Sequence, residues 1–276
     1  SLKSARNYTL IGCVEPAGRG TEWPACGGTG TESYMNLANG LLIAINNGYN
    51  PMPMPGRSGV PANEGQVGLP TGYLYEMDTF QEVLDAVKAQ IEYFVNWHII
   101  NINSFEYIGR QILPLPVVSA TMAGCMEKGM DVMWGGAKYN STGMSGVGIG
   151  NVIDSLNIIR HCCYEEKICT TREMYDAIKA DWVGYEDLQS YIKNKAPHYG
   201  NGLAKCDDLA EWVGKVFSDA CNSHTGPRGR YSAGLYPVTT NVTFGKQTGA
   251  TPDGRNAHQP LADGISAPQQ MDTNGP

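Results

Sequence analysis

The chain has 276 residues, of which 42% are hydrophobic and 17% charged, as expected for a folded globular protein. Its net charge of −7 and the lack of a basic stretch argue against nucleic acid or an anionic membrane surface as the main partner. No apolar run reaches transmembrane length. The eight cysteines lack paired CxxC spacing, which argues against a metal site and favours a reducing cytoplasm.

The first predicted elements are a strand and a helix. An apolar run at residues 8–11 predicts the strand, and residues 34–48 predict the helix, with Gly48 as its stop. Residues 49–75 are rich in proline and glycine and predict a loop. The helix would bury one stripe made of Met35, Leu37, Leu41, Leu42 and Ile45.

The clearest helix is expected from residue 78 to about residue 103. Thr79 and Glu82 fit a capping box, so the helix should begin at that point. Apolar residues then recur at spacings of three and four, which predicts one buried face. They are Phe80, Val83, Leu84, Val87, Ile91, Phe94 and Val95.

The rest of the chain continues the alternation of helices and strands. Residues 112–129 mix prolines with a short helical pattern, and a helix is expected over residues 150–166 after a short strand and a glycine-rich turn. β-Branched residues from Val238 to Phe244 predict a late strand. Together these elements predict an α/β fold. Two more amphipathic helices are predicted at residues 172–182 and 207–224.

Two other patterns favour structural interpretations. The stretch GMSGVGIGN has Asn151 where a dinucleotide-binding loop needs its third glycine, so a tight loop that opens a helix is preferred. The histidines are scattered singly, which favours positions at the surface or at the edge of the core over a metal site or a Ser–His pair. They are His98, His161, His198, His224 and His258.

Cys13 and Glu15 form the most informative local pattern. On an extended segment, residues i and i+2 point to the same side, so the thiol and the carboxylate could face one substrate. An adjacent carboxylate raises the pKa of a thiol, which disfavours a thiolate nucleophile. A sulfur radical that removes a hydrogen atom, beside a carboxylate base, has no such conflict. A surface glutamate beside a buried cysteine is the structural alternative.

Three motifs carry a resemblance to a known family. GCVEP at residues 12–16, WGGAKYN at 134–140 and GATPDGRNAHQPLADGIS at 249–266 resemble the glycyl radical enzymes, the pyruvate formate-lyase-like superfamily. The motifs occur in the family's order and at about its spacing. GCVEP contains a single cysteine, and in this it resembles the family's branch of dehydratases, other lyases and decarboxylases. Pyruvate formate-lyase itself has two adjacent cysteines at this site.

The resemblance implies a fold and a reaction. The family fold is a ten-stranded α/β barrel made of two half-barrels, and residues 1–276 would be a single piece of it, the C-terminal half-barrel. Cys13 would become the thiyl radical and Glu15 the general base, on a small hydroxylated substrate that loses water or an amine. Radical decarboxylation, C–S cleavage or an inactive fragment with only a structural role are the alternatives. Gly254 and Arg255 would be architectural.

The resemblance also implies partners and missing parts. The glycyl radical, installed by a radical S-adenosylmethionine iron–sulfur activating enzyme, would lie outside this segment, which binds no cofactor of its own. The N-terminal half-barrel is missing too, so the chain is expected to be an excised piece and inactive alone. The complete enzyme would be an anaerobic, cytoplasmic homodimer.

Four residues are predicted to bind the substrate. Trp23 is followed by the small residues of Pro24–Gly28, which disfavours glycerol and choline and favours another hydroxylated or amine-bearing molecule or a bulkier aromatic acid. Arg228, Arg230 and Tyr236 lie where family members line the pocket, and an arginine there would suit an anionic group. A solvated loop charge is the alternative for either arginine.

Overall fold

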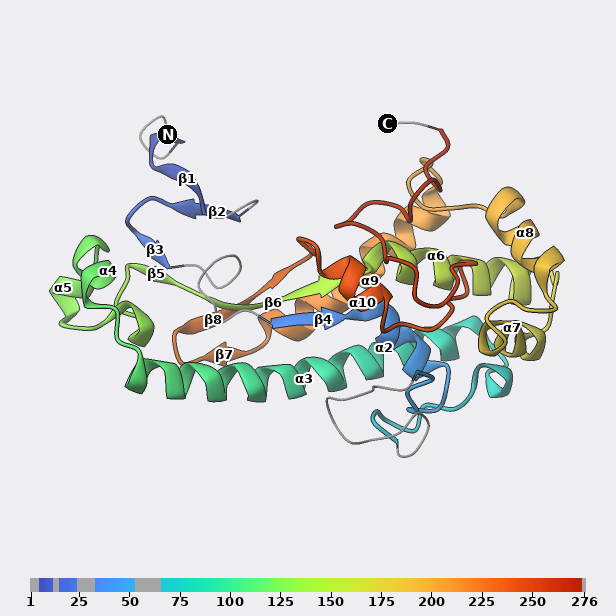
Figure 1. Ribbon diagram of the computed structural model, residues 1–276, viewed down its shortest axis with the longest axis horizontal. Helices are drawn as coiled ribbons and strands as arrows, with labels where there is room; N and C mark the ends of the chain where they lie inside the picture. Colours follow the sequence, from blue (N-terminus) through green and yellow to red (C-terminus); the bar gives the residue numbers. More distant parts are fainter. Residues whose placement is uncertain (1–4, 12–14, 24–32, 53–65, 275–276) are drawn as a thin grey trace. The chain divides into compact units, whose positions relative to one another are not determined.

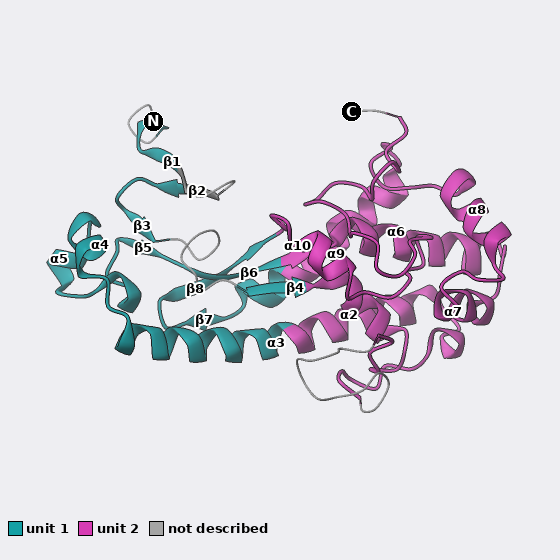
Figure 2. Cartoon of the chain, in the orientation of Figure 1, with its two compact units in different colours: residues 1–35, 95–145, 218–234 teal, residues 36–94, 146–217, 235–276 magenta. Residues whose placement is uncertain are grey.

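The computed structural model describes residues 5–11, 15–23, 33–52 and 66–274, and it mixes helices with strands (Figure 1). The predicted α/β class is therefore confirmed. The chain divides into two compact units, which are coloured separately in Figure 2. Unit 1 comprises residues 1–35, 95–145 and 218–234, and unit 2 comprises residues 36–94, 146–217 and 235–276.

The largest sheet has four strands, most of whose residues belong to unit 1. They are β4 (Ser33–Asn36), β6 (Thr142–Val147), β7 (Thr225–Gly226) and β8 (Gly229–Gly234). Their order across the sheet is β4–β6–β8–β7. β6 and β8 are parallel, with Thr142 opposite Tyr231 and Ser145 opposite Gly234, while β7 and β8 form an antiparallel hairpin.

Two smaller sheets lie in unit 1. The predicted strand at residues 8–11 is confirmed as β1 (Tyr8–Ile11), which pairs antiparallel with β2 (Glu15–Gly18). A second pair joins β3 (Glu22–Trp23) and β5 (Tyr139–Asn140) in parallel. The N-terminal segment is thereby tied to residues more than a hundred positions later in the chain.

The longest helix, α3 (Phe80–Ile112), begins where the sequence predicts it. The Thr79 amide donates to Glu82 Oε2 at 2.8 Å, and the Glu82 amide donates to Thr79 Oγ1 at 3.3 Å, so the capping box is present. Val83, Val87 and Ile91 are fully buried, which confirms the predicted apolar face. The first part of α3 belongs to unit 2 and its second part to unit 1.

Unit 1 also contains short helical segments, of which the first begins at Pro116. They are α4 (Pro116–Thr121), α5 (Cys125–Lys128) and the 3-10 turn η2 (Val132–Trp134). Asp131 fixes this region, because its Oδ2 accepts from the Leu115 amide at 2.9 Å and from Ser119 Oγ at 2.7 Å. The predicted short helical pattern is thus confirmed.

The other helices lie mainly in unit 2. The predicted helices at residues 150–166, 172–182 and 207–224 are confirmed by α6 with η3, α7 and α9, whereas α8 was not predicted. The glutamate and aspartate in the first turn of α8 and the lysines in its last turn are the signal that could have found it. The bounds are α2 (Leu37–Ala44), the 3-10 turn η1 (Leu74–Glu76), α6 (Ile149–Ile159), the π-helical continuation η3 (Arg160–Glu165), α7 (Thr171–Lys179), α8 (Glu186–Lys195), α9 (Ala204–Asn222) and α10 (Thr240–Gly245).

The helix predicted over residues 34–48 is shorter than expected. Asn36 Oδ1 accepts from the Asn39 amide at 2.9 Å and caps α2, so Met35 lies in strand β4 and not on the helix. The helix ends at Ala44. Gly48, which was expected to stop it, has φ +81° and donates its amide to the Ile43 carbonyl at 2.9 Å, so it closes the turn that follows the helix.

The strand predicted over residues 238–244 is wrong, because residues 240–245 form helix α10. The Leu261 amide donates to the Asn241 carbonyl at 3.1 Å, and Asn241 Nδ2 donates to the Leu261 carbonyl at 3.2 Å. A Cβ on Gly245 would lie 2.2 Å from the Gln259 carbonyl oxygen. This docking against residues 259–261 outweighs the local β propensity of Val242 and its neighbours.

The glycine-rich stretch before α6 combines a strand with a tight turn. β6 is buried along its whole length, and Gly146 lies so close to its neighbours that a Cβ would be 2.7 Å from Leu37 Cδ1. Gly148 then takes φ +83°, a left-handed conformation that favours glycine, and α6 begins at the next residue. The predicted turn that opens a helix is confirmed. Among the described residues, no helix has the length and apolar character to cross a membrane.

Candidate functional site

Of the predicted Cys13–Glu15 pair, the backbone of Glu15 belongs to the N-terminal strand pair. β1 ends at Ile11, which is the pairing partner of Glu15, the first residue of β2. Cys13 lies outside the described residues, as does the side chain of Glu15. Their shared role stays a prediction.

Trp23 belongs to β3 and packs into a small hydrophobic core of unit 1. Its half-buried indole contacts a cluster formed by Cys125, Val132, Met133 and Ala137. Its carbonyl accepts from the Ser141 amide, which continues the pairing with β5. Trp23 is therefore held on both its backbone and its side chain, and its contact with a substrate stays a prediction.

Arg228 lies in the turn between β7 and β8 and is almost fully buried. Its Nη2 and Nε are each 2.9 Å from Glu106 Oε1, and Thr142 Oγ1 donates to the same carboxylate oxygen. Glu106 comes from α3 and is 1% exposed. The charge of Arg228 is thus compensated inside unit 1. A further role in holding an anionic substrate group stays a prediction.

The other two predicted substrate-binding residues are in different units. Arg230 is an exposed residue of β8 in unit 1, and Tyr236 is half-buried just after β8, in the part of the chain that belongs to unit 2. Cys13 lies outside the described residues, and the proposed substrate contacts of Arg230 and Tyr236 stay predictions.

The ATPDGR motif forms a tightly bonded loop around Arg255. This guanidinium is 7% exposed and donates to several backbone carbonyls, among them Gln259 O at 2.8 Å and Asn256 O at 2.9 Å. Gly254 has φ +85°, and a Cβ there would be 3.2 Å from Lys193 Cγ. Burial lowers the pKa of Arg255 below its ordinary value, and the nearby charges of Asp253 and Asp181 offset this effect only in part. These contacts agree with the architectural role predicted for the motif.

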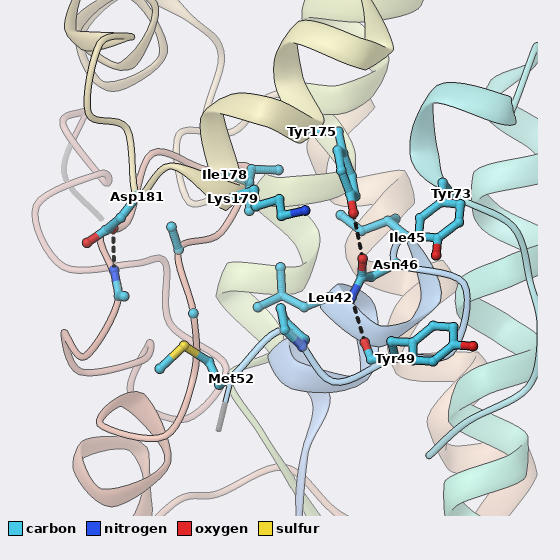
Figure 3. A pocket seen from close by; sticks show the side chains of 14 residues that line it. Leu42, Ile45, Asn46, Tyr49, Met52, Tyr73, Tyr175, Ile178, Lys179 and Asp181 are labelled. Atoms are coloured by element: carbon cyan, nitrogen blue, oxygen red, sulfur yellow. Dashed lines mark hydrogen bonds between the residues drawn. The ribbon is translucent and has the colours of Figure 1, made fainter. Parts of the chain in front are cut away.

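Unit 2 contains a cavity of about 490 Å³, and Figure 3 shows its walls. Tyr175 Oη donates to Asn46 Oδ1 at 2.7 Å, and Asn46 Nδ2 donates to the Tyr49 carbonyl at 2.8 Å. The volume of this cavity is in the range of small-molecule binding sites. The described residues that line it are Leu42, Ile45, Asn46, Tyr49, Pro51, Met52, Tyr73, Tyr175, Ile178, Lys179, Asp181, Gly249, Ala250 and Ala257.

Sequence reasoning missed this cavity because its walls come from separate segments. The excess of tyrosines in the sequence was a weak signal: Tyr73, Tyr75 and Tyr175 form one aromatic cluster, with ring centroids 5.0–6.0 Å apart. Burial raises the pKa of Tyr175 to about 12, so its hydroxyl stays protonated and donates to Asn46. Tyr236 is not among the described residues that line the cavity.

The prediction for the histidines is wrong at His198. This residue is 6% exposed, and its Nδ1 lies 2.9 Å from Asp154 Oδ2 while its Nε2 lies 2.8 Å from the Ile192 carbonyl. The carboxylate is also fixed by the Tyr199 amide at 2.7 Å. His198 therefore belongs to the interior of unit 2. Within the described part of the chain, no group of three or more His, Cys, Asp or Glu side chains is arranged to hold a metal ion.

The comparison with known families decides the membership of the chain. The family described as "Pyruvate formate lyase-like" matches residues 1–245. The chain belongs to this family. The resemblance inferred from GCVEP, WGGAKYN and ATPDGR is thus confirmed, and the mixed α/β fold is part of the family's barrel.

Individual members of the pyruvate formate lyase-like family match all or nearly all of the chain. It is 32% identical to trans-4-hydroxy-L-proline dehydratase of Clostridioides difficile, over 100% of this chain and 33% of that protein. It is 33% identical to (2S)-3-sulfopropanediol dehydratase of Klebsiella oxytoca, over 96% of this chain and 31% of that protein. The glycerol-bound structure of the B12-independent glycerol dehydratase from Clostridium butyricum matches with a TM-score of 0.88 and 36% identity, over 100% of this chain and 33% of that one.

The chain spans about a third of the length of these relatives. These three relatives are named as dehydratases, and a further matching structure is named as a glycyl radical enzyme, so the family is one of radical lyases.

Proposed function

We propose that this chain is part of a glycyl radical lyase that eliminates water or an amine from a small hydroxylated substrate. The observation that carries the proposal is the Cys13-Val14-Glu15 sequence within a chain of the pyruvate formate lyase-like family. The three relatives described above, at 32–36% identity, are named as dehydratases of hydroxyproline, sulfopropanediol and glycerol, all of which are small hydroxylated molecules, whereas an isethionate sulfite-lyase and an indoleacetate decarboxylase match at 29% and 26%. This supports a dehydratase over the alternatives of radical decarboxylation and C–S cleavage.

Cys13 and Glu15 would carry the chemistry. The stored glycyl radical of the complete enzyme would supply the one-electron chemistry that turns the Cys13 thiol into a thiyl radical. The Cys13 sulfur then takes a hydrogen atom from a substrate carbon, which forms an S–H bond and leaves the unpaired electron on that carbon. Glu15 accepts a proton from the neighbouring hydroxyl. The bond to the leaving group on the adjacent carbon breaks, the leaving group keeps the electron pair, and a departing hydroxyl takes up one proton and leaves as water, which balances the proton removed by Glu15. The Cys13 S–H then returns a hydrogen atom to the product radical.

The substrate would be held by residues of this chain together with others outside it. Trp23, Arg228, Arg230 and Tyr236 are the proposed contacts. The small residues of Pro24–Gly28 would leave room for a substrate larger than glycerol or choline. An arginine would favour an anionic group on that substrate.

The complete enzyme would need parts that this chain does not contain. We place the stored glycyl radical outside residues 1–276 and infer that an iron–sulfur activating enzyme installs it. Residues 1–276 would form one piece of the catalytic barrel and have no turnover alone. The working enzyme would be a cytoplasmic homodimer.

Product analysis tests the proposed reaction. The complete polypeptide would be activated without oxygen and given a panel of small hydroxylated acids, diols and amino alcohols, with products identified by mass spectrometry. A product that has lost water or ammonia supports the proposal. Release of carbon dioxide or sulfite without a dehydrated product would overturn it and favour the other reactions of the family. Failure of the activated protein to consume any substrate in the panel would count against an enzyme of this type.

A further inference from the structure

Unit 2 contains a pair of thiols that the proposed reaction does not use. Cys163 lies in the π-helical segment η3, and Cys169 lies just before α7. Their Sγ atoms are 3.8 Å apart. Cys163 is half-buried and Cys169 is 9% exposed. A disulfide has an S–S distance of about 2.05 Å. The two Sγ atoms, 3.8 Å apart, would have to approach each other by rotation of the cysteine side chains to reach it.

The backbone on both sides holds this pair in place. The Cys169 amide donates to the Cys162 carbonyl at 3.2 Å, which ties the loop back to η3. The next residue, Thr170, caps α7, because its Oγ1 accepts from the Glu173 amide at 3.1 Å and its own amide donates to Glu173 Oε2 at 2.7 Å. These hydrogen bonds fix the two backbone segments that carry Cys163 and Cys169, so the two thiols are held within reach of each other.

Electrostatics favours the same pair over the neighbouring Cys162. The hydrogen bond from Cys163 lowers the pKa of Cys169, which makes Cys169 the more easily ionised thiol. Burial raises the pKa of Cys162 to about 12, and that side chain is 0% exposed. A thiolate is the reactive form in disulfide chemistry, so Cys162 is poorly suited to it.

A metal site does not account for these three cysteines. No cluster of three or more possible metal ligands occurs in the described ranges, although Cys162, Cys163 and Cys169 are close in sequence. Two sulfurs in contact, with the third thiol buried and protonated, favour chemistry that needs two thiols only.

We propose that Cys163 and Cys169 form a reversible disulfide when the protein meets a peroxide. Two S–H bonds break and one S–S bond forms, so the cysteines lose two electrons and two protons. Hydrogen peroxide accepts both, its O–O bond breaks, and two water molecules are released. The bond would close a loop of only a few residues, so it would stabilise the fold only slightly. Its main effect would be a reversible covalent modification of the protein by peroxide.

The complete polypeptide, purified without oxygen, provides the test. It would be treated with stoichiometric hydrogen peroxide, alkylated, and digested with trypsin without reduction. Trypsin cleaves after Arg160, Lys167 and Arg172, so the two cysteines fall in separate peptides, 161–167 and 168–172. We expect these peptides to be joined, lighter by two hydrogens than their sum, and separated again by dithiothreitol. Recovery of 168–172 as the alkylated or sulfonic acid form, without the joined species, would overturn the proposal.

Because peptide 161–167 contains both Cys162 and Cys163, two variants identify the partner. Cys162→Ser should keep the joined peptides, and Cys163→Ser should abolish them. Fragmentation of the joined wild-type peptides assigns the same bond without any variant, so a poorly folded variant leaves the test intact. A bond from Cys169 to Cys162 in the wild-type protein, or a joined species that persists in Cys163→Ser, would contradict the assigned pair.

Discussion

Glu106 and Arg228 form an ion pair in the interior of unit 1, with 2.9 Å between Oε1 and Nη2. Their side chains are 1% and 0% exposed, and they are separated by 122 residues in the chain. The pair fixes the turn between β7 and β8 to helix α3. Burial of two charges is costly, but removal of one partner is costlier, since the other charge then stays buried without compensation.

We therefore expect Glu106→Ala to lower the free energy of unfolding by about 3–5 kcal/mol. Urea unfolding followed by circular dichroism would measure it. Lys88→Ala is the matched control on the same helix, because Lys88 pairs with Glu92 at 3.9 Å with both side chains about half exposed. That change should cost less than about 0.5 kcal/mol. Similar losses for the two variants would contradict a buried ion pair.

His198 and Asp154 predict a pH dependence of stability. The two ring nitrogens of His198 face Asp154 Oδ2 and the Ile192 carbonyl, so the protonated ring can donate to both. Burial lowers the pKa of His198, but the hydrogen bond to Asp154, its charge and the Ile192 carbonyl together raise it above the ordinary value of 6.5. A raised folded-state pKa gives stability that is fully present below the unfolded pKa.

This contribution should disappear as the pH rises from about 6.5 through the higher folded-state pKa of His198. Thermal unfolding midpoints measured across this range should fall in the wild-type protein. His198→Gln removes the titrating group and should flatten that part of the profile, even if the variant is less stable throughout. An identical slope in both proteins would show that His198 is not the group responsible.

Two helical glycines provide a matched pair for close packing. A Cβ on Gly150, in α6, would lie 2.3 Å from the Ser266 carbonyl oxygen and 2.9 Å from Ala262 Cβ. A Cβ on Gly214, in α9, would have no heavy atom within 4 Å. Gly150→Ala should therefore destabilise the protein by about 1–3 kcal/mol, since backbone must move. Gly214→Ala should stabilise it by about 0.4–1 kcal/mol, and thermal unfolding would measure both. The same sign for both changes would contradict the packing around Gly150.

The sequence correctly predicted those elements whose position is set by neighbouring residues. The capping box of Thr79 and Glu82 and the apolar spacing that follows were enough to place the start of α3. Strand β8 was missed because its sequence, GRYSAG, has little β propensity, and its extended state depends on pairing with β6, which is distant in the chain. Helix α10 was predicted as a strand because the contacts of Asn241 with Leu261 are invisible to local propensity.

The candidate sites also differ in whether neighbouring residues or only the folded chain bring their parts together. The Cys13–Glu15 motif is contiguous and could be found from the sequence, and it led to the correct family. The burial of Arg228 against Glu106 could not be predicted, because no local pattern links residues from α3 and from the β7–β8 turn. The cavity of unit 2 is built from segments that the fold alone brings together, such as those of Asn46 and Tyr175.

The most direct test of the proposed function is the turnover of the complete, activated enzyme after Cys13→Ala. The proposal predicts no product above background, because no other sulfur of this motif could take the hydrogen atom, and a loss of at least about 100-fold for Glu15→Gln. Cys163→Ala, a change of a cysteine outside the proposed chemistry, should keep near wild-type turnover. Wild-type product formation by Cys13→Ala would contradict the proposal.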